Sequence, residues 1–247
     1  MINRYICTFL LTIAFCHAHE KKDSSQTRSK LIHVGFGVFS LKSDLSREYK
    51  IFTPGYIVAI RYFKKKWING SLNFNYFRVI SENYESNWNE FSAFTPANFV
   101  KTEVFSGEYT LVLNLIKTSK HNFFLAQGLG IAYFQPYDSE RKRLIDKPNT
   151  RNRGEDFNNI SFTLPTFLGY QFLLNKQCGF SGQIKWLRQQ SDYFDNLSQL
   201  SLKKVKDNVL SIQFSFSYLF NNQYEEIPLD EYRRVYRNKK KYRISLK

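Results

Sequence analysis

The feature that most constrains this chain is an alternation of large apolar residues with small, uncharged polar ones. The clearest case is 208–220, NVLSIQFSFSYLF, where Leu, Ile, Phe and Tyr take one parity while Ser and Gln take the other. A β-strand places successive side chains on opposite faces, so one face would be wholly apolar and the other small and hydroxylic. Because water-facing strands usually carry charges, this pattern favours a strand whose outer face contacts hydrocarbon.

The same period of two recurs in eight segments. They are 31–41, 55–63, 71–80, 104–116, 122–134, 159–174, 179–187 and 208–220. Each is about nine residues or longer, enough to cross the hydrocarbon layer as a tilted strand. Aromatic residues make up 17% of the chain, yet the mean hydropathy is −0.44. Apolar and polar residues are therefore finely mixed, as transmembrane strands require.

The connections between these segments alternate strictly in length. Three are short, at 64–70, 117–121 and 175–178, and four are long and hydrophilic, at 42–54, 81–103, 135–158 and 188–207. Short turns at one end and long loops at the other are typical of outer-membrane barrels, and a closed barrel satisfies every backbone polar group without an edge. We therefore predict an all-β fold, an eight-stranded antiparallel up-and-down transmembrane β-barrel with a basic C-terminal tail.

The N-terminal segment 1–18 has the pattern of a secretory signal peptide. Arg4 precedes an apolar run too short to span a bilayer as a helix, and Cys16-His17-Ala18 offers small residues for cleavage. The alternative is a lipoprotein signal acylated at Cys16. We predict a flexible polar leader at 19–30, the barrel at 31–220 and the tail at 221–247.

The cysteines and histidines predict neither disulfides nor a metal site. Cys178 is alone once the signal peptide is removed, so no intrachain disulfide can form. The remaining histidines, His19, His33 and His121, show no metal-ligand spacing. We expect no metal and no cofactor.

Four ionisable residues take the inward parity, and they are the candidate site residues: Arg61, Glu108, Lys185 and His33. The interior of an eight-stranded barrel is about wide enough for its own side chains. We therefore predict a hydrogen-bonded polar network that plugs the lumen, with a proton or solute path as the alternative. No His-x-Ser pair lies on a strand, so the sequence assigns no catalytic residue.

The C-terminal tail is strongly basic within a chain of formal net charge +15. Its cations include Arg233, Arg234, Arg237, Lys239, Lys240, Lys241 and Arg243. A charge run of this kind is either a solvated tail or a docking segment for an anionic surface or protein partner, which we place in the periplasm. An exported chain makes nucleic acid a poor partner.

One residue interrupts the strand pattern. Pro165 lies inside the sixth segment and has no N–H to donate to the ladder. We therefore expect a β-bulge at this position.

Three segments carry a family resemblance: FLAQGLGIAYF, SFTLPTFLGYQF and SIQFSFSYLF, at 124–134, 161–172 and 211–220. They resemble the small outer-membrane barrels of Bacteroidetes-type bacteria, the PorT-like and OmpX-like barrels, including the family of the secretion component PorT. The resemblance implies residence in the outer membrane and a part in secretion or envelope assembly.

Together these patterns predict a non-enzymatic outer-membrane protein that contacts membrane lipid, with both termini in the periplasm. It would support envelope structure, adhesion or a secretion complex. The alternative is an outer-membrane lipid-modifying enzyme with its site at the barrel rim. A third possibility is a soluble exported barrel that binds a small ligand.

Overall fold

The structure is a computed structural model that describes residues 30–63, 67–82, 97–118, 120–147, 158–175, 177–197 and 206–220. The predicted signal peptide, the leader up to residue 29 and the basic tail lie outside these residues. In the described part of the chain, no helix is long and apolar enough to cross a membrane.

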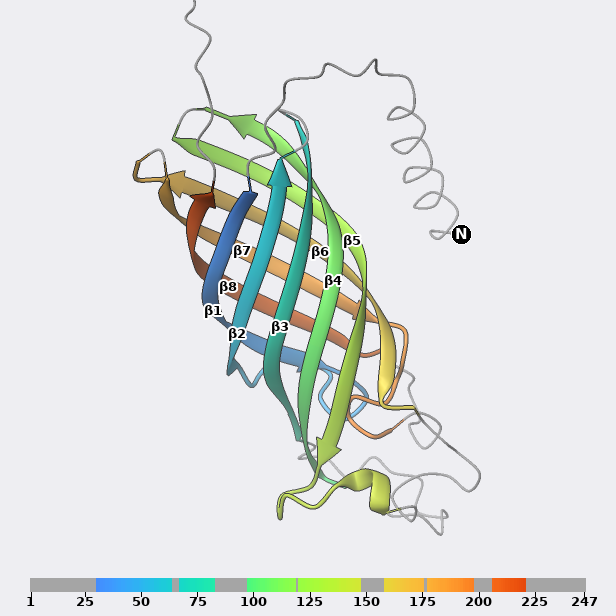
Figure 1. The fold of residues 1–247 in the computed structure, drawn as a ribbon. Coiled ribbons are helices and arrows are strands. Elements are labelled where there is room, and N and C mark those ends of the chain that lie inside the picture. Colours follow the sequence, from blue (N-terminus) through green and yellow to red (C-terminus); the bar gives the residue numbers. More distant parts are fainter. Residues whose placement is uncertain are drawn as a thin grey trace, which may run out of the picture.

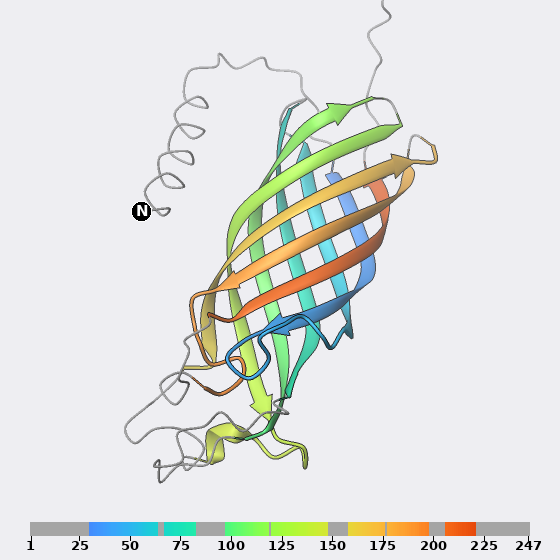
Figure 2. The same ribbon diagram turned by 180° about the vertical axis from the view of Figure 1, so that it is seen from behind.

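Eight antiparallel strands close into one barrel in sequence order, as Figures 1 and 2 show from opposite sides. They are β1 (Lys30–Lys42), β2 (Thr53–Phe63), β3 (Ile68–Glu82), β4 (Phe99–Lys117), β5 (His121–Tyr137), β6 (Ile160–Leu173), β7 (Cys178–Gln189) and β8 (Asn208–Phe220). The barrel closes because β1 pairs with β8 along its whole length. The predicted fold is confirmed.

The two parities of each strand face opposite environments. Large apolar side chains point outward and stay exposed, as in Phe36 (63%), Tyr56 (69%), Leu129 (62%) and Phe162 (65%). Residues of the other parity are buried and mostly polar, small or both. This is the reverse of a water-soluble domain, in which exposed apolar patches are small, and it matches a barrel wetted by hydrocarbon.

The connections separate by length between the two ends of the barrel. The short connections lie at the end where β1 begins and β8 finishes, which we call the turn end. The described parts of the long connections and the short 3-10 helix η1 (Leu144–Asp146) lie at the opposite end, which we call the loop end. The described ends of the chain, Lys30 and Phe220, are paired with each other at the turn end.

The described parts of the long connections pack against one another at the loop end. Leu45, Val100, Leu144 and Leu197 form a buried cluster there. They come from the β1–β2 connection, the start of β4, η1 and the β7–β8 connection. A second apolar cluster, which includes the stacked rings of Phe39 and Phe77, lies inside the barrel.

The bulge expected at Pro165 is not present. Pairing between β5 and β6 stops at Leu164 and Pro165 but resumes in the same register, from Gln127↔Thr166 to Gly130↔Thr163. Because proline has no N–H, the ladder loses hydrogen bonds there without needing an extra residue. A register shift occurs instead between Asn114 and Ile116, where β4 pairs with β5 near the turn end.

Candidate functional site in the barrel lumen

The four candidate residues all point into the barrel and are almost fully buried. Their exposed fractions are 3% for Arg61, 3% for Glu108, 2% for Lys185 and 4% for His33. They come from β2, β4, β7 and β1 respectively. The structure brings them together as two groups, one around Glu108 and Lys185 and the other around Arg61 and His33.

Glu108 and Lys185 form an ion pair across the lumen. Lys185 Nζ donates to both carboxylate oxygens of Glu108, at 2.7 Å to Oε1 and 2.5 Å to Oε2. Their strands, β4 and β7, are not neighbours in the barrel, so the pair links separate parts of the wall. Glu108 Oε1 also accepts from Ser106 Oγ and Asn75 Nδ2, each at 3.2 Å.

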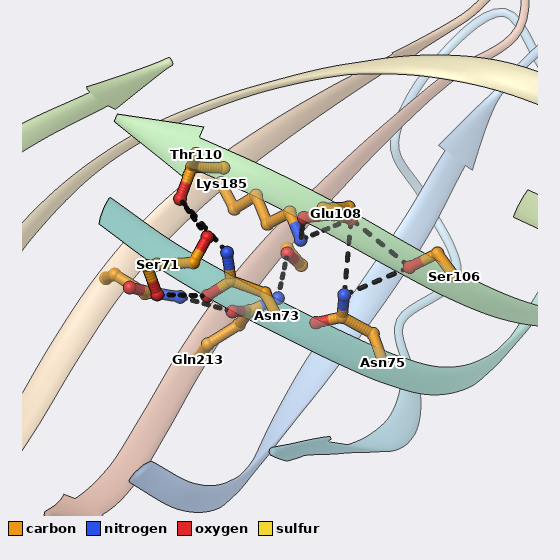
Figure 3. Close-up of polar contacts among 10 residues, drawn as sticks. Ser71, Asn73, Asn75, Ser106, Glu108, Thr110, Lys185 and Gln213 are labelled. Atoms are coloured by element: carbon orange, nitrogen blue, oxygen red, sulfur yellow. Dashed lines mark hydrogen bonds and ion pairs between the residues drawn. The ribbon is translucent and has the colours of Figure 1, made fainter. Parts of the chain in front are cut away.

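Neutral polar side chains extend this network along the wall, as Figure 3 shows. Asn73 Nδ2 donates to Thr110 Oγ1 at 3.0 Å, and Ser71 Oγ donates to Asn73 Oδ1 at 3.1 Å. On the other side of the lumen, Gln213 Nε2 donates to a serine on its own strand, β8, and Gln213 Oε1 accepts from Gln183. These bonds satisfy most of the polar groups beside the ion pair, as buried polar groups require.

The second group lies in the turn-end half of the lumen. The Arg61 guanidinium stacks over the Phe124 ring at 4.3 Å, and its Nη1 lies 3.5 Å from Gln171 Oε1. The Nδ1 atom of His33 lies 3.4 Å from Ser181 Oγ and 3.5 Å from Ser215 Oγ. The two serine hydroxyls are hydrogen-bonded to each other at 2.7 Å.

Apolar clusters lie on either side of the Glu108–Lys185 network. Phe39, Phe77 and Phe134 belong to the cluster on the loop-end side, and Phe124 and Phe167 to the cluster on the turn-end side. Side chains therefore fill the lumen, as expected for a barrel of this size. This geometry links separate parts of the wall and keeps charges buried.

The cluster of His33 with two serines is a contact that the sequence alone did not reveal. The three residues belong to β1, β7 and β8, and strand pairing brings them together. The only signal in the sequence was that all three take the inward parity, which does not fix the register. Within the described residues, no group of three or more His, Cys, Asp or Glu side chains is arranged to hold a metal ion.

Buried aspartates in the long connections form another cluster that the sequence did not indicate. Asp195 Oδ2 accepts from Leu45 N at 2.9 Å and its Oδ1 accepts from Leu197 N at 3.0 Å, tying two connections together. Asp207 Oδ2 accepts from Phe194 N at 2.7 Å. Burial raises the pKa of Asp195 to about 7, and burial together with the charge of Asp195 raises the pKa of Asp207.

The outward face becomes polar toward the loop end. Arg78 Nε donates to Glu103 Oε1 at 3.0 Å on neighbouring strands, and the Arg188 guanidinium stacks over the Trp186 ring at 4.9 Å. Both cations are exposed. They mark the loop-end limit of the apolar outer belt, where aromatic and charged side chains are typical of a membrane interface.

No protein-family profile matches the chain, and no curated protein matches its sequence. Neisserial surface protein A is similar in structure at 8% identity, over 77% of this chain and 97% of that one, with a TM-score of 0.50. Ail, the attachment invasion locus protein of Yersinia pestis, was solved with the heparin analogue sucrose octasulfate. It is 12% identical over 79% of this chain and all (100%) of that one, with a TM-score of 0.47.

The outer membrane enzyme PagL is also similar, at 12% identity over 75% of this chain and 98% of that one, with a TM-score of 0.38. Identities this low describe the fold and not the role. The chain has the fold of the small eight-stranded outer-membrane β-barrels, as the similarity to Neisserial surface protein A indicates.

Proposed function

We propose that this protein is a non-enzymatic component of the bacterial outer membrane. In this proposal the barrel is a sealed anchor in lipid, and the loop end presents a binding surface outside the cell for adhesion or envelope organisation. The observation that carries it is the order of the loop end. Leu45, Val100, Leu144 and Leu197 pack together, and Asp195 ties two connections by hydrogen bonds.

The filled lumen supports an anchor over a channel. A transport role would need a path for solute, whereas the Glu108–Lys185 pair and its hydrogen-bonded neighbours cross the interior. The exposed apolar belt supports residence in lipid. A soluble ligand-binding barrel, our third possibility, would have to leave this belt in water.

The orientation can be tested with single cysteines in a Cys178→Ser background. Ser139, beyond β5 at the loop end, and Gln177, in the β6–β7 turn, are both exposed. With a membrane-impermeant maleimide on intact cells, we expect S139C to react and Q177C to react only after permeabilisation. The reverse result would contradict the proposed orientation and, with it, surface presentation by the loop end.

The binding role can be tested by replacing residues 138–147 with a short Gly-Ser connection. This segment carries η1, whose Leu144 is buried, and a series of exposed charged residues. We expect the barrel to assemble but cells to lose attachment to host-type surfaces or heparin-like polyanions. Unchanged attachment, with the protein present at its normal level, would contradict adhesion through this segment.

The basic tail carries a separate part of the proposal. The cations of 221–247 lie outside the described residues, and the described chain leaves the barrel at the turn end. We propose that the tail docks an anionic surface or a secretion-complex partner in the periplasm, in line with the resemblance to PorT-like barrels. Deleting 221–247 should remove co-purifying proteins in a gentle pull-down, whereas unchanged partners would contradict docking.

One observation favours the lipid-modifying alternative: His33 lies beside Ser181 and Ser215. A nucleophilic serine needs such a base, but it also needs access to its substrate. His33 is 96% buried inside the barrel, away from the outer face. We therefore expect His33→Ala, Glu108→Gln and Arg61→Gln to leave the lipid A acylation pattern unchanged by mass spectrometry, and an altered pattern would favour the enzyme.

A further inference from the structure

Among the described residues, Arg61 is a buried cation without a buried acid to balance it. Its side chain is 97% buried on β2, and none of the ion pairs among the described residues includes it. Glu108, the buried acid of the lumen network, already neutralises Lys185. The turn-end half of the lumen therefore holds an excess of one positive charge in the described part of the chain.

Arginine cannot relieve this excess by losing a proton, because its guanidinium stays charged in proteins. Its contact with the Phe124 ring at 4.3 Å is a favourable cation–π interaction, but this replaces only part of the lost hydration. The approach to Gln171 Oε1, at 3.5 Å, is at the limit of a hydrogen bond. A buried charge without a partner is costly, so a counter-ion would stabilise it.

Of the residues that the structure describes in this part of the lumen, two have a buried side-chain nitrogen without a hydrogen-bond partner. These nitrogens are Arg61 Nε, which carries a proton, and His33 Nε2, which carries one in the tautomer whose Nδ1 accepts from the serine hydroxyls. The two residues take the inward parity of adjacent strands, because Arg61 on β2 pairs with Leu31 and His33 on β1 pairs with Ala59. They are close enough for the charge of Arg61 to act on the His33 ring. Unsatisfied donors of this kind are uncommon in native interiors.

We propose that the turn-end half of the lumen binds one small monovalent inorganic anion of the chloride type, held by Arg61 and His33. A single negative charge balances the excess, and one small ion suits a site formed by two unpartnered nitrogens, Arg61 Nε and His33 Nε2. A divalent anion would overcompensate the charge. This inference does not depend on the adhesion or envelope role proposed above, since it concerns the opposite end of the barrel.

The test is a ³⁵Cl NMR titration of the full mature chain, untagged, in a zwitterionic detergent with gluconate as the background anion. We expect saturable broadening of the chloride line that bromide reverses by competition. Chloride should also raise the thermal unfolding midpoint relative to gluconate at equal ionic strength. Arg61→Gln should weaken chloride binding by at least ~10-fold, since it removes the only charged donor of the site.

Arg188→Gln is the matched control, because it removes an exposed arginine that also stacks on an aromatic ring, Trp186. It should leave chloride broadening and the chloride-dependent stabilisation unchanged. If Arg61→Gln does not fold, the wild-type titration still decides. The absence of specific broadening and of chloride-dependent stabilisation would overturn the proposal. That result would mean that a carboxylate of the chain itself, or water alone, balances the charge of Arg61. Equal loss in Arg188→Gln would also overturn it.

Discussion

At the scale of single residues, Glu108 and Lys185 are two buried charges of the lumen that are paired with each other. Both residues are almost fully removed from solvent, as their exposed fractions of 3% for Glu108 and 2% for Lys185 show. An ion pair in such a place is weak evidence of added stability, because desolvation offsets much of the attraction. The two charges nevertheless depend on each other, since either one alone would be buried without a partner.

This dependence predicts a non-additive pair of substitutions. Glu108→Gln should lower the free energy of unfolding by about 3–5 kcal/mol because it leaves the Lys185 ammonium unpaired. The double variant Glu108→Gln/Lys185→Met should recover most of that loss. Urea unfolding of the refolded barrel in lipid vesicles measures both values. Simple additivity of the two substitutions would show that the charges do not interact as the geometry indicates.

Residue identity predicted the inward position of His33, Arg61, Glu108 and Lys185, because parity alone decides which face a strand residue takes. It did not predict which inward residues meet. His33 reaches Ser181 and Ser215 only because β1 pairs with β8 and β8 with β7 in specific registers. The buried aspartates of the long connections were missed for a related reason: irregular segments have no period that reveals burial.

At the scale of the elements, closure of the barrel depends on close contact between β1 and β8. A Cβ atom on Gly35 would lie 2.0 Å from Phe214 O and 2.6 Å from Ser215 Cα, both backbone atoms of β8. Only a residue without a side chain allows the strands to approach this closely. Gly107, by contrast, is on the outward face, where a Cβ atom would meet the Phe74 ring at an ordinary 3.7 Å.

We therefore expect Gly35→Ala to destabilise the barrel by about 1–3 kcal/mol through overpacking at the closing seam. Gly107→Ala, the matched control, should change stability by less than ~1 kcal/mol. The two variants are compared by the midpoint of urea unfolding and by the amount of protein that migrates as a folded barrel on unheated gels. A similar small effect for both variants would mean that β1 and β8 can move apart without cost.

The strand pattern predicted the elements well because hydrocarbon outside and packed side chains inside enforce strict alternation. It failed at Pro165, where we expected a bulge. The ladder accepts a proline by leaving Leu164 and Pro165 unpaired with β5, while Pro165 still aligns with Leu187 on β7. The missing donor therefore removes hydrogen bonds locally, and the register with β5 is the same on both sides of the gap.

The long connections give the loop end a stability that depends on pH. Asp195 and Asp207 are buried near Asp44 and Asp192, and burial raises the pKa of Asp195 to about 7 from an ordinary value of 3.8. Between these values the folded state holds a proton that the unfolded state has lost. The contribution of Asp195 to the free energy of unfolding is therefore most favourable below about pH 4. It falls as the pH rises toward 7 and is constant above that.

We expect the stability of the loop end to fall by on the order of a few kcal/mol as the pH rises from about 4 to about 7. Asp195→Asn should reduce this dependence because its amide has no charge to bury, while the buried Asp207 still contributes. The measurement is the pH dependence of the backbone amide resonances of Leu45 and Leu197, which donate to Asp195. Glu140→Gln, at an exposed acid of another long connection, is the control and should keep the wild-type profile.

At the scale of the whole molecule, apolar side chains cover the outside of the barrel and polar side chains line its inside, an arrangement that is stable only if lipid surrounds the barrel. The outward face carries exposed Phe, Tyr, Leu, Ile and Val on all eight strands, and the charged side chains of the described residues lie inside the barrel or toward its two ends. In water such a surface would drive association. In a bilayer the same surface is solvated, and the backbone has no unpaired edge to expose to hydrocarbon.

A depth-dependent pair of arginine substitutions tests this directly. Leu129, 62% exposed, pairs with Tyr109 in the middle of the outward belt, whereas Ile160, 53% exposed, is the first residue of β6 at the loop end. Leu129→Arg should destabilise the barrel in lipid vesicles by about 2–4 kcal/mol, because the cation is placed near the bilayer midplane, and Ile160→Arg by about 0–1 kcal/mol. In a soluble barrel both positions would face water and tolerate arginine equally. Equal costs, or a wild-type protein of residues 19–247 that stays monodisperse without detergent, would mean that water and not hydrocarbon surrounds the belt.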